Sequence, residues 1–220
     1  MSSQTSNPGL SLWLVVAKDD HPFRQSLVEL IQSTIPTNFA QGVVKSNFEP
    51  HVTVVSGIDA SSVKHPQAWL DGLSLPSDLR KELKEATIEL ERVEAGDDFF
   101  RKVTIAAKED ENLMRLAAVC RQQAAQVSEA DAKEWAAKEY QPHLSLAYAD
   151  IAKSEVQKKI PLIELQLGWE FGSLFDCCGG TLAMEAKLAL VDTSKSVDEW
   201  QILATRQVPW VRWTMARSLI

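Results

Sequence analysis

The chain has 220 residues, of which 45% are hydrophobic and 24% are charged, and its formal net charge is −7. These proportions are typical of a globular protein and argue against a disordered or membrane-embedded chain. The negative charge argues against long nucleic acid as a partner, because polynucleotide binding depends on many Lys and Arg contacts to phosphates. We therefore expect one domain over residues 1–220, monomeric, with residues 1–9 and about 207–220 flexible or peripheral.

No segment reads as a membrane span or a secretion signal. The apolar run "LSLWLVVA" at residues 10–17 is too short to cross a bilayer, and no basic segment precedes it. The cysteines Cys120, Cys177 and Cys178 give no even disulfide framework, which favours a reducing compartment. We expect a cytoplasmic or membrane-peripheral protein.

Hydrophobic periodicity predicts strands and helices in mixed order. Strands are expected over residues 10–17, 51–56, 143–148, 181–192 and 199–207, with two more between 87 and 107 that turn around 96–98. Helices are expected from 22 to about 35, within 61–73, from 109 to about 127, over 129–138 and near 154–165. Because strands and helices do not alternate regularly, the sequence predicts an α+β fold with antiparallel sheets.

The chain repeats one phrase, "FEPHVTV" at 48–54 and "YQPHLSL" at 140–146. Side chains alternate along a strand, so His51 shares a face with Thr53, and His143 shares a face with Ser145. Residues two apart lie roughly 6.5 Å from each other, so an imidazole and a hydroxyl can contact one phosphate-sized group. Each proline lacks an N–H for a sheet ladder, which places each histidine at the beginning of a strand or near an edge or bulge.

Two imidazoles and two hydroxyls form a set that suits phosphodiester hydrolysis without a metal. A neutral histidine can take a proton from water while a protonated one gives a proton to the departing oxygen. We assign His51 as the base and His143 as the acid, although the symmetry of the repeat leaves the opposite assignment open. Thr53 and Ser145 can donate hydrogen bonds to the non-bridging phosphate oxygens.

The segments "PHVTV" and "PHLSL" resemble the paired His-x-Thr/Ser motifs of the 2H phosphoesterase superfamily. The contexts "FEPHVTV", "EWAAKEYQPHLSLAYAD" and "VDEWQIL" narrow the resemblance to fungal-type cyclic phosphodiesterases, that is, 2′,3′-cyclic-nucleotide 3′-phosphodiesterases. The resemblance implies a bilobal α+β fold in which two antiparallel sheets face each other across a cleft, with helices outside. It also implies an association with the Golgi.

The activity implied by the resemblance is hydrolysis of small cyclic phosphodiesters without a cofactor. ADP-ribose 1″,2″-cyclic phosphate, a by-product of tRNA splicing, would yield the 1″-phosphate, and nucleoside 2′,3′-cyclic phosphates would yield 2′-phosphates. The catalytic histidines of the family fall on His51 and His143, and its phosphate-binding hydroxyls on Thr53 and Ser145. A substrate-contacting tyrosine falls on Tyr148, whose odd offset from His143 fits only if the strand ends or bulges near Ala147.

Two alternative functions remain open beside cyclic phosphodiesterase activity. Within the superfamily, an RNA 2′,5′ ligase or RNA-end phosphodiesterase is the first alternative, and a non-catalytic nucleotide-binding module is the second. His21 and His65 each precede a proline and lack a hydroxyl residue two places on, so they are expected in surface loops.

Tryptophans and an adjacent pair of cysteines are weaker candidates for functional sites. Trp13, Trp169 and Trp200 could stack on a nucleobase, but their apolar neighbours favour the core. The pair Cys177 and Cys178 lacks the spaced partners of a zinc site.

Overall fold

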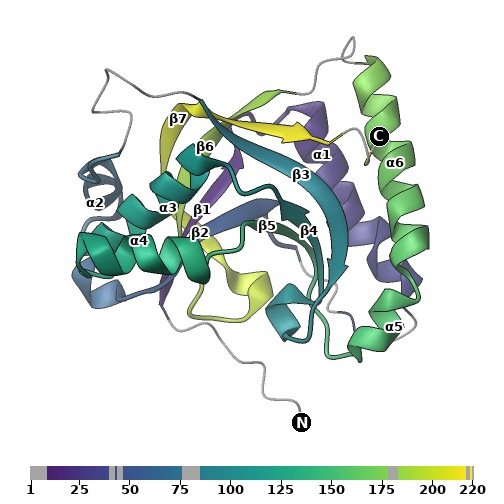
Figure 1. Cartoon of the computed structure of the whole chain (residues 1–220), viewed down its shortest axis with the longest axis horizontal. Coiled ribbons are helices and arrows are strands. Elements are labelled where there is room, and N and C mark those ends of the chain that lie inside the picture. The colour runs from purple at the N-terminus through teal and green to yellow at the C-terminus, as the bar shows by residue number, and fades with distance from the viewer. Residues whose placement is uncertain are drawn as a thin grey trace.

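The computed structural model describes residues 9–39, 43, 47–75, 85–177, 183–216 and 219. In this part of the chain, strands close into a barrel in the order β1-β2-β5-β4-β3-β7-β6 (Figure 1). Their bounds are β1 (Leu10–Val16), β2 (His51–Ile58), β3 (Ala86–Ala95), β4 (Val103–Ala107), β5 (His143–Ala147), β6 (Met184–Asp192) and β7 (Gln201–Met215). Strands β3 and β7 pair in parallel, and the other neighbours are antiparallel.

Helices lie outside the barrel on two sides. Their bounds are α1 (Pro22–Glu29), α2 (Pro66–Asp71), α3 (Glu111–Ala124), α4 (Glu129–Lys138), α5 (Lys153–Gln157) and α6 (Ile160–Cys177). Figure 1 shows α3 and α4 on the side opposite α1 and α6. Helix α3 begins where the Asp110 carboxylate accepts hydrogen bonds from the N–H groups of Asn112 and Leu113, and its buried face packs on the barrel. No helix within the described ranges is long and apolar enough to cross a membrane.

The predicted α+β class is confirmed, and the predicted helices and strands are present with different bounds. The helix that begins at Pro22 changes to a π-helical turn over Leu30–Thr34. The helix expected near 154–165 is two helices, and α6 continues to Cys177. Two sheets facing each other across a cleft are not confirmed, since the strands form one closed barrel in which Val52 of β2 pairs with Leu144 of β5.

The C-terminal prediction needs correction, because residues 207–215 are barrel strand rather than flexible or peripheral chain. Strand β7 runs between β6 and β3, and Val211, Trp213 and Met215 turn inward at alternate positions. A register shift opposite Glu185 and Ala186 marks a bulge around Pro209. A proline fits there because the bulged residue needs no ladder hydrogen bond, so the strand continues past it. Residues 1–8 of the N-terminal prediction lie outside the described ranges.

Candidate active site

The two repeated motifs begin neighbouring strands. His51 is the first residue of β2 and His143 is the first residue of β5, as the preceding prolines predict. The strands are antiparallel with Val52 opposite Leu144, so the register places His51 across from Ser145 and Thr53 across from His143. All four side chains line one cavity of about 160 Å³. Each histidine therefore stands beside the hydroxyl of the other copy.

Aromatic and hydroxyl side chains form most of the remaining cavity wall. The aromatic residues are Trp13, Phe100, Tyr148 and Trp200, the hydroxyls are Ser11, Ser56 and Thr193, and the cation is Arg101. These residues come from β1, β2 and the loops after β3, β5 and β6, so closure of the barrel assembles them. The cavity combines flat apolar walls, which suit a ring, with hydroxyls and a cation, which suit an anion.

Both histidines are held in the same tautomer. The Nδ1 atom of His51 lies 2.6 Å from the carbonyl oxygen of Glu49, and that of His143 lies 2.8 Å from the carbonyl oxygen of Gln141. A carbonyl oxygen only accepts, so Nδ1 carries the hydrogen in each ring. This leaves Nε2 as the atom that can take or give a proton.

The two histidines differ in their surroundings. The pKa of His51 is lowered to about 3, mainly by burial; the Glu49 carbonyl raises it, and the nearby His143 lowers it. His143 is half-buried; its pKa is lowered mainly by burial and also by Arg101, while the Gln141 carbonyl and Glu94 raise it. The neutral form is therefore strongly favoured at His51. His143 is the more exposed of the two and has an acidic neighbour that favours its charged form.

Tyr148 can reach the cavity because the strand ends just before it, as its odd offset from His143 requires. Strand β5 ends at Ala147, and its register with β4 shifts between Ser145 and Ala147. The Tyr148 side chain consequently lines the same cavity as the histidine of its own motif. Its ring stacks on Phe48 with 4.5 Å between centroids. Burial raises the pKa of the phenol, and a hydrogen bond with Ser145 opposes this, so the phenol stays a neutral donor.

The three candidate tryptophans differ in their positions. Trp13 is buried as expected, yet it lies in the wall of the cavity and contacts His51. Trp200 also lines the cavity and packs edge-on against Trp13. Trp169 was expected in the core, but it is 79% exposed on α6, because it falls on the face of the helix opposite the buried Phe171.

His21 and His65 stand outside the cavity, each as the N-cap residue of a helix that begins with proline. The Nδ1 atom of His21 accepts a hydrogen bond from the N–H of Phe23 at 3.2 Å, which gives it a structural role at the start of α1. Cys120 is a free thiol in the core, where burial raises its pKa to about 12. The prediction for the Cys177 and Cys178 side chains lies outside the described part of the structure.

Sequence reasoning missed Arg101. It lies in the short turn that joins β3 to β4, and its Nη2 atom donates to Oε1 of Gln141 at 2.8 Å. A second cavity of about 360 Å³ shares Arg101 and His143 with the first. The missing signal is the pairing of β4 with β5, which brings the turn to the second motif and is not visible in local sequence.

The described side chains contain no group of three or more His, Cys, Asp or Glu residues placed to hold a metal ion.

Comparison with known proteins covers nearly the whole chain. A family model described as "Cyclic phosphodiesterase-like protein" matches residues 8–208. A 2′,3′-cyclic-nucleotide 3′-phosphodiesterase of Phaeosphaeria nodorum is 34% identical over 205 residues, which cover 91% of this chain and 100% of that protein. Proteins of the same name from Neurospora crassa and Yarrowia lipolytica are 28% and 30% identical, each over 90% of this chain and 99% of the relative.

Proposed function

Since this chain belongs to the cyclic phosphodiesterase-like family, we propose that it hydrolyses cyclic phosphodiesters by general acid-base catalysis with two histidines. The observation that carries the proposal is the convergence of both motifs on one cavity. His51, Thr53, His143 and Ser145 come from segments about ninety residues apart and line the same 160 Å³. The named activity of three relatives supports the same conclusion.

The histidines divide the proton transfers between them. Nε2 of neutral His51 takes a proton from water as the water oxygen attacks phosphorus. The bond from phosphorus to one ring oxygen breaks, and Nε2–H of protonated His143 gives its proton to that oxygen. The product is an acyclic phosphomonoester, and exchange with solvent returns both histidines to their starting forms. The low pKa of His51 keeps this imidazole in the neutral form, which a base requires.

Hydroxyl donors supply the stabilisation of charge. Negative charge grows on the non-bridging oxygens as water adds, and Thr53, Ser145 and the neutral phenol of Tyr148 line the cavity around them. In the free protein the Ser145 hydroxyl donates to the carbonyl oxygen of Phe100 at 3.3 Å. That bond is long, so exchange for a charged phosphate oxygen is favourable.

The proposed substrates are nucleoside 2′,3′-cyclic phosphates, which give 2′-phosphates, and ADP-ribose 1″,2″-cyclic phosphate from tRNA splicing, which gives the 1″-phosphate. Both carry the same five-membered phosphate ring, which fits the smaller cavity. The adjoining 360 Å³ cavity offers room for the rest of the molecule. Its acidic residues Glu91, Glu94 and Glu109 outnumber Arg92 and Arg101, so it is no basic track for a polynucleotide. This argues against the RNA ligase and RNA-end alternatives.

We also propose that the barrel is bilobal. The barrel is joined at one side by a single ladder pair between β2 and β5, and at the other by the parallel pairing of β3 with β7. These junctions would divide it into one half with β1, β2, β6 and β7 and another with β3, β4 and β5, each carrying one motif. The monomeric state, and a cytoplasmic, membrane-peripheral or Golgi location, stay predictions.

The proposal is tested by turnover in the presence of EDTA. The protein is incubated with either cyclic substrate, and phosphorus NMR identifies the isomer of the product. We expect ring opening to a single phosphomonoester with EDTA present. Failure to open either ring would reject the enzyme, and binding without turnover would support the nucleotide-binding module. Faster turnover of an RNA carrying a 2′,3′-cyclic end would favour the RNA-end alternative.

A further inference from the structure

In both motifs, an arginine from another element holds the side chain two residues before the histidine. Arg24 of α1 donates from Nε to Oε1 of Glu49 at 2.6 Å and from Nη2 to the other carboxylate oxygen. Arg101 donates to Oε1 of Gln141 at 2.8 Å. These clamped residues are the ones whose carbonyl oxygens hold Nδ1 of His51 and His143. The same arrangement has thus been built twice from unrelated arginines.

The backbone before His51 is held through side chains rather than by a sheet ladder: Phe48 is buried against Tyr148, and Asn47 bonds to Gln32 and Asp198. Residues 47–50 belong to no helix or strand, and Pro50 has no N–H that could tie the segment to a neighbour. Glu49 precedes this proline and is restricted to extended conformations, yet the direction of its carbonyl still varies with its ψ angle. A clamp on the Glu49 side chain therefore limits where the carbonyl oxygen can point.

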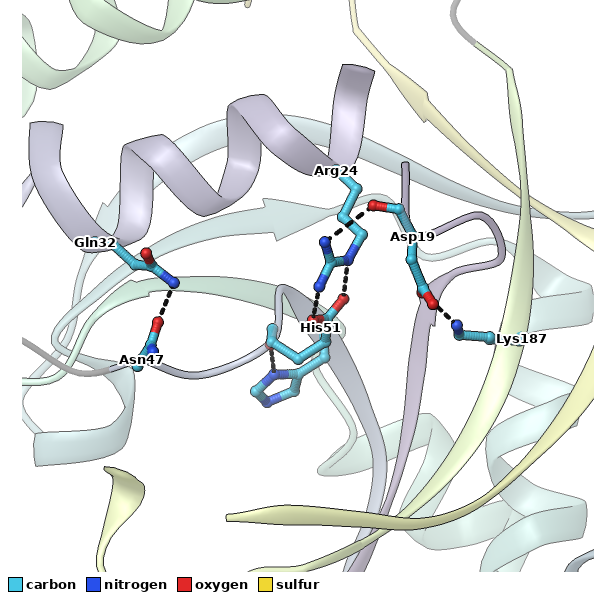
Figure 2. Close-up of polar contacts among 7 residues, drawn as sticks. Asp19, Arg24, Gln32, Asn47, His51 and Lys187 are labelled. Atoms are coloured by element: carbon cyan, nitrogen blue, oxygen red, sulfur yellow. Dashed lines mark hydrogen bonds and ion pairs between the residues drawn. The ribbon is translucent and has the colours of Figure 1, made fainter. Parts of the chain in front are cut away.

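Arg24 is itself held by Asp19, which lies between β1 and α1. Its Nη1 atom donates to the backbone carbonyl of Asp19 at 3.0 Å, and the Asp19 carboxylate accepts from Lys187 of β6 at 2.6 Å. Figure 2 shows Arg24 reaching from α1 toward His51, with Asp19 and Lys187 beside it. The Arg24 and Glu49 side chains are only 24% and 17% exposed, so their bidentate pair is shielded more than an ordinary surface ion pair.

We propose that Arg24 is a positioning residue for His51: through Glu49 it holds the carbonyl that keeps the hydrogen on Nδ1 and the lone pair on Nε2. The inference rests on the proposed function of the site, where His51 is the base. If the carbonyl turns away, the neutral ring can place its hydrogen on Nε2, and that tautomer cannot accept a proton from water at this atom. Loss of Arg24 should therefore lower kcat and leave KM nearly unchanged.

The second motif indicates how a substitution at Glu49 should behave. It uses a neutral Gln141 where the first uses Glu49, so an amide is sufficient to receive an arginine donor. Glu49→Gln should keep one bond from Arg24 and most of the activity. Arg24→Gln removes the guanidinium fork and should lower kcat roughly 10-fold, the lower end of the effect measured for groups that orient metal-ligating histidines. Arg24→Lys keeps the charge without the fork and should fall between wild type and Arg24→Gln.

The test combines kinetics with nitrogen NMR of the histidine rings in the same variants. The wild type and Glu49→Gln should show the Nδ1–H tautomer at His51, and Arg24→Gln should show a mixture. Lys138→Gln serves as the matched control, because it removes an exposed ion pair with Glu134 on α4 and should leave kcat and the tautomer unchanged. Thermal unfolding of each variant separates positioning from a general loss of stability.

Several outcomes would overturn the inference. An Arg24→Gln protein with the wild-type tautomer and kcat would do so, and so would a Glu49→Gln protein as impaired as Arg24→Gln. If Arg24→Gln does not fold, wild-type kcat and tautomer in Arg24→Lys would count against it. The NMR measurement does not require turnover. A wild-type protein that opens no cyclic phosphate would therefore reject the proposed function, while the tautomer data would still test the positioning role of Arg24.

Discussion

The imidazole of His51 lies flat against the indole of Trp13, with 3.6 Å between ring centroids and 8° between planes. The indole covers one face of the ring, and the His51 residue as a whole is only 4% exposed. Removing this cover admits water to the imidazole, and water stabilises the charged form more than the neutral one. The stacked pair therefore helps to keep the candidate base unprotonated.

Replacing Trp13 with alanine should raise the pKa of His51 from about 3 toward its ordinary value near 6.5. A base acts only when neutral, so the acid limb of the pH profile of kcat/KM should move to higher pH. NMR titration of the His51 ring and the rate profile measure the same shift independently. A limb that stays in place would show that Trp13 does not set this pKa.

His51→Ala and His143→Ala should each lower kcat by roughly 10²- to 10⁴-fold, the usual scale for one acid-base group. The double variant should lose less than the product of the two effects, because the residues act as a unit. His65→Ala is the control, since His65 is exposed and its side chain caps no backbone group. Wild-type rates in either active-site variant would return that histidine to a structural role.

Arg101→Gln should raise the pKa of His143, because the guanidinium lowers it in the wild type. The acid must be protonated, so the alkaline limb of the pH profile should move to higher pH, and KM for the anionic substrate should increase. Arg92→Gln, in the wall of the neighbouring cavity, is the matched control and should leave the limb in place. A limb that moves to lower pH in Arg101→Gln would contradict His143 as the acid.

Trp213→Ala should destabilise the protein by about 3–5 kcal/mol, the range for a buried large aromatic side chain. Trp213 is 0% exposed in β7. Trp169→Ala removes the same side chain from the 79% exposed position on α6 and should change stability by less than about 0.5 kcal/mol. Urea unfolding of both variants measures the difference. Equal effects would mean that β7 is no integral strand of the barrel.

The polar pattern of the motifs was sufficient to pair each histidine with a hydroxyl on one face of a strand, because strand parity and proline are local properties, and all four side chains line one cavity. Tyr148 was expected there only from the family resemblance, because strand parity alone would turn it away. The residues that surround them were harder to predict. Arg24 reaches Glu49 from α1, and Arg101 reaches Gln141 across the pairing of β4 with β5. Such contacts depend on how distant elements meet, which no local pattern encodes.

Two elements extend beyond the bounds predicted from the sequence. The strand predicted over 199–207 continues through a bulge around Pro209, and β7 ends at Met215. Gly168 and Gly172 lie inside α6, where a Cβ at either position would meet nothing within 4 Å. The helix runs through both of them because its buried face supplies the packing.

The antiparallel pairing of Val52 with Leu144 gives the motifs an approximate half-turn symmetry, since each histidine lies across from the other motif's hydroxyl. A five-membered phosphate ring rotated by that half turn would meet nearly the same set of donors and bases. The motifs alone therefore cannot choose which of the two ring oxygens departs. Regioselectivity, and with it the identity of the product isomer, must come from the unequal walls: Trp13 on one side, and Arg101 with its acidic neighbour Glu94 on the other.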